Sequence, residues 1–167
     1  MTPSNHEMSS SKLRQTAEKF INHFKTLDAA AVKAIIADDY RHEFAPASIN
    51  PPGPFDRQGW LEYHSTLGEL LVGFPVTVKE YLVSESSNRV TVWATSGITF
   101  REDVKDNEDP QEDWSYQGEY VFMFTMDETG EKIRRTVEFL DSKATADRLM
   151  PLFNRARENK QKRSASE

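Results

Sequence analysis

The chain has 167 residues and a mass of 19.2 kDa, a size typical of one domain, and it carries a formal net charge of -6 with a pI of about 5.3. The absence of cysteine excludes disulfides, cysteine-ligated zinc and thiol nucleophiles, and the acidic balance argues against a nucleic-acid or membrane-surface partner. No apolar run approaches the roughly 20 residues that span a bilayer, and the N-terminal residues MTPSNHEMSSSK lack the apolar stretch of a secretory signal, so we expect a soluble cytoplasmic protein.

The polar residues concentrate at the two ends and in one internal segment. We therefore expect flexible tails at 1–11 and 158–167, on either side of a single domain at 12–157. Inside that domain, the acidic stretch REDVKDNEDPQED at 101–113 is expected to form a hairpin tip.

Three helices are predicted in the first half of the chain. Over 12–27 the apolar residues recur at steps of three and four, which is the pattern of an amphipathic helix. Asp28 can cap a short second helix over 29–39, and Asp56 can cap a third helix over 57–74.

The segment between the second and third helices is predicted to be extended. Four prolines within 46–54 exclude a helix there. Because helices fix both ends of this loop, it is a natural rim for a pocket.

Beyond Pro75 the apolar period changes from about 3.6 to about 2, which indicates strands. The predicted strands are 76–85, 89–100, 116–126 and 132–141, joined in part by hairpin turns at 86–88 and 127–131. A last segment, KATADRLMPLFNRAR, predicts a C-terminal helix that Pro151 kinks or shortens, with Asp141 as its cap. This order predicts an α+β domain in which a curved, mostly antiparallel sheet wraps around helices and leaves a conical cavity.

The order of elements, the segment YRHEFAPASINPPGP and the closing segment EKIRRTVEFLDS together resemble the SnoaL-like branch of the NTF2-like superfamily. Within it, the sequence is similar to fungal cyclases and isomerases of secondary-metabolite pathways. The resemblance covers roughly 12–153 and implies an NTF2-like (SnoaL-like) cone. Because that superfamily includes enzymes, transport factors and binding modules, the site has to be argued from its residues.

Strand alternation predicts the catalytic residues. Tyr116 and Tyr120 share one face of their strand, and Glu138 lies among core residues on the next strand. If both faces point into the cone, Glu138 is poorly solvated and its pKa rises toward the range useful for proton transfer. Arg41 is the candidate cation that holds a substrate oxygen, although it could equally pair with a surface carboxylate, and both tyrosines could be ordinary sheet-face aromatics.

The resemblance implies the same four residues. Semipinacol-type isomerases of this branch use an arginine after the second helix, a Tyr-x-x-x-Tyr pair and a glutamate on the following strand, and the four candidates match that set in type and order. Related meroterpenoid-pathway isomerases use a histidine and carboxylate set instead, which His42, His64 and Glu43 could supply.

Five further residues are predicted to bind substrate: Trp60, His64, Trp93, Phe122 and His42. His42 and Arg41 are adjacent, so both cannot face the cavity if their segment is extended. The face on which Trp93 lies is ambiguous, and His64 lies on an apolar helix stripe, which favours a core or cavity-lining histidine.

Dinucleotide-binding, P-loop, zincin and nucleophile-elbow motifs are absent from the sequence, so no cofactor or metal is expected. Two functions of different class remain open. One is a cofactor-independent isomerase or cyclase of a small hydrophobic natural product, in its most specific form a semipinacol-type rearrangement of an indole alkaloid; the other is a non-catalytic ligand-binding module. The apolar outward residues Val121, Met123 and Val137 further predict a homodimer.

Overall fold

A computed structural model of the chain describes residues 5–106 and 114–166, and its largest element is a six-stranded sheet in the order β2-β1-β8-β7-β5-β4. Four strands form an antiparallel meander: β4 (Val76–Ser84), β5 (Arg89–Gly97), β7 (Gln117–Met126) and β8 (Ile133–Leu140). The strand β1 (Ile36–Ala45) joins β8 in parallel, and β2 (Phe55–Asp56) pairs antiparallel with β1. A separate pair joins β3 (Leu71–Gly73) to β6 (Thr99–Phe100). The predicted α+β class and mostly antiparallel sheet are confirmed.

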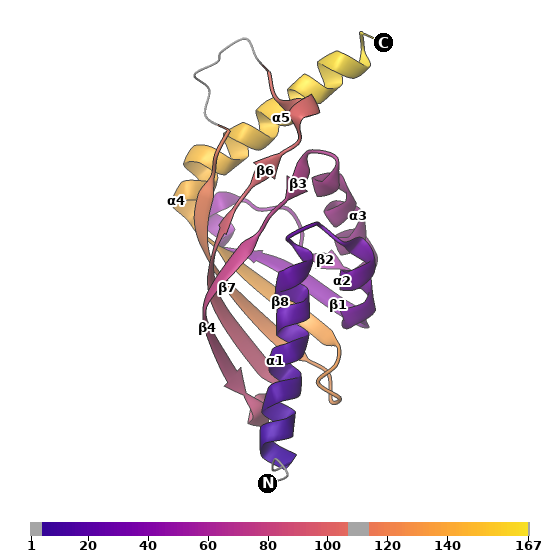
Figure 1. Cartoon of the computed structure of the whole chain (residues 1–167), viewed down its shortest axis with the longest axis vertical. Helices are drawn as coiled ribbons and strands as arrows, with labels where there is room; N and C mark the ends of the chain where they lie inside the picture. The colour runs from indigo at the N-terminus through magenta and orange to yellow at the C-terminus, as the bar shows by residue number, and fades with distance from the viewer. Residues whose placement is uncertain (1–4, 107–113, 167) are drawn as a thin grey trace.

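Helices close the hollow of the curved sheet (Figure 1). The helix α1 (Asn5–His23) runs along one face of the sheet, with α2 (Ala29–Ile35) and α3 (Arg57–Gly68) beside β1 and β2, and α5 (Met150–Ser164) crosses the end far from the N-terminus. The predicted apolar stripe of α1 is buried against the inner side of β5 and β7, where aromatic side chains dominate. The core residues at this contact are Leu13, Ala17, Phe20, Phe24, Val90, Val92, Phe122 and Phe124.

Both central helices end earlier than their apolar patterns predicted. The second helix stops at Ile35 rather than continuing to residue 39, because the chain from Ile36 onward pairs with β8 and its burial alternates along the strand. The third helix stops at Gly68, and the apolar residues beyond it form β3. In both places, backbone pairing with a distant strand outweighs the local helical pattern. The predicted caps are confirmed, since Asp28 accepts from the Ala31 amide and Asp56 from the Gly59 amide.

The C-terminal helix contains a π-helical turn just before Pro151, and it is longer than predicted, since α5 continues to Ser164. Asp141 caps a first turn, α4 (Ser142–Ala144), by accepting a hydrogen bond from the Ala144 amide at 3.0 Å. A π-helical turn (Thr145–Leu149) follows, and Pro151 lies in the first turn of α5, where its missing N–H costs no helical hydrogen bond.

Helices extend into both segments that the sequence predicts as flexible tails. In the segment 158–167, α5 continues to Ser164 because Asn159 is buried and its amide donates to the Val104 carbonyl at 3.0 Å, while Arg163 donates to the Lys105 carbonyl at 2.6 Å. In the segment 1–11, α1 begins at Asn5.

The acidic segment is described only at its start. A 3-10 turn, Glu102–Val104, follows β6, and the predicted hairpin tip at 107–113 lies outside the described residues. Among the helices that the structure describes, none is long and apolar enough to cross a membrane.

The outer face of the sheet carries an apolar patch, as predicted. Met123 is 39% exposed there, Val121 and Val137 are half-buried beside it, and the neighbouring Trp93 and Phe139 are 42% and 45% exposed. We refer below to these five residues as the outer patch.

Candidate active site

A cavity of about 470 Å³ lies inside the cone, between the sheet, α3, the proline-rich loop and α5. Its wall is mostly aromatic and aliphatic, with Phe44, Trp60, Phe74 and Phe153 among its rings. The loop predicted as a pocket rim does line it, through residues 49–52. A cavity of this size with a few polar groups is the usual form of a small-molecule site.

Glu138 supplies the carboxyl group of this cavity. Its position on β8 opposite Phe122 of β7 and Phe44 of β1 leaves the side chain 4% exposed among aromatic rings. Burial penalises the charged form, and this raises the pKa of Glu138 from its ordinary value of 4.5 to about 8. At neutral pH the group is therefore a carboxylic acid with a proton to give.

His42 lies directly against this carboxyl. Its Nε2 atom is 3.3 Å from Oε2 of Glu138, and among the described residues neither atom has a hydrogen-bond partner. The imidazole stacks on the Trp60 indole with ring centroids 3.6 Å apart, which fixes its plane. Complete burial lowers the pKa of His42 to about 3, so the ring is neutral beside a neutral carboxyl.

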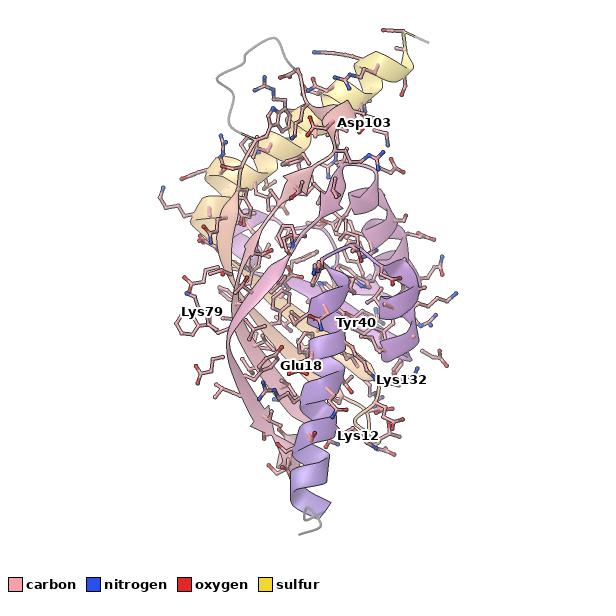
Figure 2. All side chains as sticks on the ribbon, in the orientation of Figure 1. Lys12, Glu18, Tyr40, Lys79, Asp103 and Lys132 are labelled. Carbon is pink, nitrogen blue, oxygen red and sulfur yellow. The ribbon has the colours of Figure 1, made fainter. Side chains whose placement is uncertain are left out.

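A hydroxyl chain behind His42 determines which of its nitrogens carries the proton. The Tyr40 hydroxyl donates to Oγ1 of Thr136 at 2.9 Å and lies 2.8 Å from Nδ1 of His42. Because that hydroxyl has a single proton, Nδ1–H donates to Tyr40 and Nε2 is left as an acceptor that faces the acid form of Glu138. Figure 2 shows Tyr40 inside the domain, whereas Lys79 projects from the outer side of the sheet.

The two predicted tyrosines form a hydrogen-bonded pair. Their hydroxyl oxygens are 2.8 Å apart, and Tyr120 lines the cavity while Tyr116 lies behind it. Gly118 between them makes this possible, because a Cβ at that position would collide with the Tyr116 hydroxyl. Burial raises the pKa of both phenols, so they remain protonated hydrogen-bond donors.

The prediction that Arg41 lines the cavity is wrong. The segment is a strand, and its alternation turns His42 inward and leaves Arg41 exposed on the outer face, opposite Asp56 of β2. Glu43, the carboxylate of the alternative set, is also on that outer face, where Arg135 donates to it at 2.9 Å.

The predicted substrate-binding residues divide in the same way. Trp60 lines the cavity, and His42 lies against Glu138. Phe122 and His64 are buried in the core behind the wall, with the His64 ring 5.0 Å from that of His23. The prediction for Trp93 is wrong, because this residue is 42% exposed in the outer patch and its indole N–H donates to Glu119 at 2.6 Å.

Sequence reasoning missed four polar residues of this region: Tyr40, Tyr63, Thr145 and Arg157. Tyr40 has the same strand parity as His42, but the sequence analysis placed it at the start of the extended segment after the second helix and did not single it out. Arg157 follows the cavity residue Phe153 by one helical turn, and that spacing was the available signal.

No protein-family model and no curated protein matches the chain, but solved structures do. The pinacolase BvnE from Penicillium brevicompactum matches with a TM-score of 0.71 at 19% identity, over 88% of this chain and 92% of that chain. PrhC from Penicillium brasilianum matches with a TM-score of 0.72 at 17% identity, over 91% and 93%. AusH from Aspergillus nidulans matches with a TM-score of 0.65 at 20% identity, over 84% and 87%. The fold is thus an NTF2-like (SnoaL-like) cone, and the resemblance found in the sequence is confirmed at the level of the fold.

Proposed function

We propose that this chain is a cofactor-independent isomerase or cyclase that acts by acid–base catalysis on a small hydrophobic natural product. The observation that carries the proposal is Glu138, a carboxyl group kept in its acid form inside an aromatic cavity and placed 3.3 Å from a neutral imidazole. Shifted carboxyl groups in clefts are typical of proton-transfer sites. The likeness in fold to a protein described as a pinacolase supports the same class of reaction.

The specific reaction we propose is a semipinacol-type rearrangement of a hydroxyindolenine alkaloid. Glu138 gives its proton to the imine nitrogen, and a carbon substituent migrates with its bonding electrons from the carbinol carbon to the imine carbon. The carbinol carbon becomes a protonated carbonyl, and the Glu138 carboxylate takes that proton back. The product is an isomer of the substrate, and no co-reactant is consumed.

The other polar groups support this cycle. Tyr120 lines the cavity and can donate a hydrogen bond to the developing carbonyl oxygen, while Tyr116 orients it through their 2.8 Å contact. Nε2 of His42 lies 3.3 Å from Oε2 of Glu138 and presents an acceptor to its acid form, which favours one orientation of the carboxyl. Arg41 has no part in this mechanism, because it faces the outside of the sheet.

The contact between His42 and Glu138 also favours a second candidate function, a meroterpenoid- or polyketide-type isomerase or cyclase that uses a histidine and carboxylate set. The carboxylate of this set is Glu138 rather than Glu43, because Glu43 lies on the outer face in an ion pair with Arg135. A non-catalytic binding module is the remaining alternative, and such a module has no need of a shifted carboxyl in its cavity.

The proposal is tested by incubating the purified protein, dialysed against a chelator and without nucleotides, with candidate hydroxyindolenines. Mass spectrometry and chromatography should reveal a product of unchanged mass and altered retention time. Ligand binding without any conversion across indolenine, meroterpenoid and polyketide candidates would support the binding module instead.

The two tyrosines should differ in their contribution to turnover. Tyr120→Phe removes a donor that faces the cavity and should lower kcat by about 10²-fold, as the loss of one oxyanion donor does. Tyr116→Phe removes only the group behind it, so we expect about tenfold or less. The measurement is steady-state kinetics on the isomerisation, and equal losses in the two variants would contradict this assignment.

We also propose that the chain forms a homodimer through the outer patch, because these five residues are contiguous across β5, β7 and β8 and too apolar to remain hydrated. Met123→Glu should convert the dimer to a monomer in light scattering at micromolar concentration. Val72→Glu, a matched change at a residue that is 59% exposed on β3, should leave the dimer intact. A monomeric wild-type protein would contradict the proposal.

A further inference from the structure

The cavity wall contains one cation among its described residues, Arg157 of α5. Its guanidinium lies 5.4 Å from the centre of the Phe153 ring, and Nη1 is 3.5 Å from Oδ1 of Asn154, both also in the wall. Burial raises the pKa of the wall residue Tyr63 to about 12, and the positive charge of Arg157 opposes that rise. The positive charge of Arg157 therefore acts on groups inside the cavity.

Other cationic side chains of α5 bind groups elsewhere in the fold, whereas Arg157 does not. Arg155 donates to Asp106 at 2.8 Å, Lys160 to Glu69 at 2.6 Å and Arg163 to backbone carbonyls before the acidic segment. Arg157, in contrast, has no ion pair with any described residue; its hydrogen bond is the long contact to Asn154.

The charge of Arg157 is also uncompensated within the cavity. Among the described wall residues the carboxyl group is Glu138, which burial keeps protonated at neutral pH. The cavity thus combines a large aromatic surface with one net positive charge, and a guanidinium presents parallel donors that match a carboxylate.

We propose that the ligand of this cavity is an apolar ring system carrying one anionic group, a carboxylate or an acidic enol, and that Arg157 binds this group. Calling this ligand the substrate rests on the proposed function, whereas the binding itself does not. Arg157 is then a specificity residue that orients the ring system over Glu138. Because its side chain is exposed, we expect the ion pair to be worth about tenfold in affinity rather than more.

The test uses two fluorescent dyes of nearly identical shape. Anilinonaphthalene sulfonate carries an anionic group, and phenylnaphthylamine is the same ring system without it. In the full-length protein, Arg157→Gln should raise the dissociation constant of the anionic dye about tenfold and leave that of the neutral dye within about twofold. Arg157→Lys should recover part of the loss, and added salt should weaken only the anionic dye.

Lys162→Gln is the matched control, because it removes the same charge from an exposed position of the same helix and should change neither dye. Each dye should displace the other, as expected of a shared cavity. Equal losses for both dyes would show that Arg157 only packs against the ligand, and an unchanged anionic dye would show that Arg157 does not bind it. Either result, or dyes that fail to displace each other, would overturn the inference.

The dye measurements are independent of turnover. Selective loss of the anionic dye in Arg157→Gln, together with normal turnover in Glu138→Gln, would refute the proposed function and leave this inference standing. An unchanged anionic dye in Arg157→Gln, together with lost turnover in Glu138→Gln, would refute this inference and leave the proposed function standing.

Discussion

Glu138→Gln is expected to lower turnover by about 10²–10⁴-fold while the fold and the affinity for ligands are retained. The amide keeps the size of the side chain and a polar contact to His42, 3.3 Å away, but it has no acidic proton to give and no basic oxygen to take one back. The loss should therefore appear in kcat, with KM changed little. Steady-state kinetics on the isomerisation would measure it.

Glu80→Gln is the matched control for this experiment. Glu80 is exposed on β4 and far from the polar cluster of the cavity, so its replacement should leave turnover unchanged. A catalytically normal Glu138→Gln variant would remove the acid–base proposal for both candidate reactions. Loss in His42→Phe as large as in Glu138→Gln would favour the histidine and carboxylate set over the tyrosine set.

The sequence could predict the fold because, in most elements, the apolar residues of the local pattern are the residues that the structure buries. The alternation along 116–126 and the stripe along 12–27 are local signals, and the structure uses both of them. The strand β1 could not be predicted, because it is stabilised by parallel pairing with β8, almost a hundred residues further along the chain. Its first residues also continue an apolar pattern that is typical of a helix.

That missed strand also explains what the sequence could and could not predict about the site. Tyr120 and Glu138 come from strands whose parity was clear, and they do face the same cavity. Arg41 and His42 were understood as mutually exclusive, but only the β1 pairing decides that His42 is inside. Arg157 could not be placed from the sequence, because its spacing of one turn from Phe153 predicts that the two share a helix face but not that this face lines the cavity.

Wild-type protein is expected to lose stability relative to Glu138→Gln as the pH rises from about 5 to about 9. The carboxyl has an ordinary pKa of 4.5 and a folded-state pKa of about 8, so between these values the unfolded chain gives up a proton that the folded chain keeps. The free energy of unfolding therefore falls with rising pH, by up to about 5 kcal/mol, and glutamine has no such dependence. For a chain of this length, Tm of the wild type should fall by about 15 °C relative to the variant.

Thermal denaturation of both proteins across this pH range would measure the effect, and the difference between the two curves is the quantity that matters. His23 and His42, whose pKa values burial lowers to about 3, destabilise the fold as the pH falls below 6.5, so the comparison is made above that pH, where both histidines are neutral in the folded and unfolded chains. The difference should grow up to about pH 8 and then level off, because above that pH both folded and unfolded carboxyls are ionised. Parallel curves would mean that Glu138 is already ionised in the folded protein at neutral pH, and the cavity would then have no acid to start the proposed rearrangement.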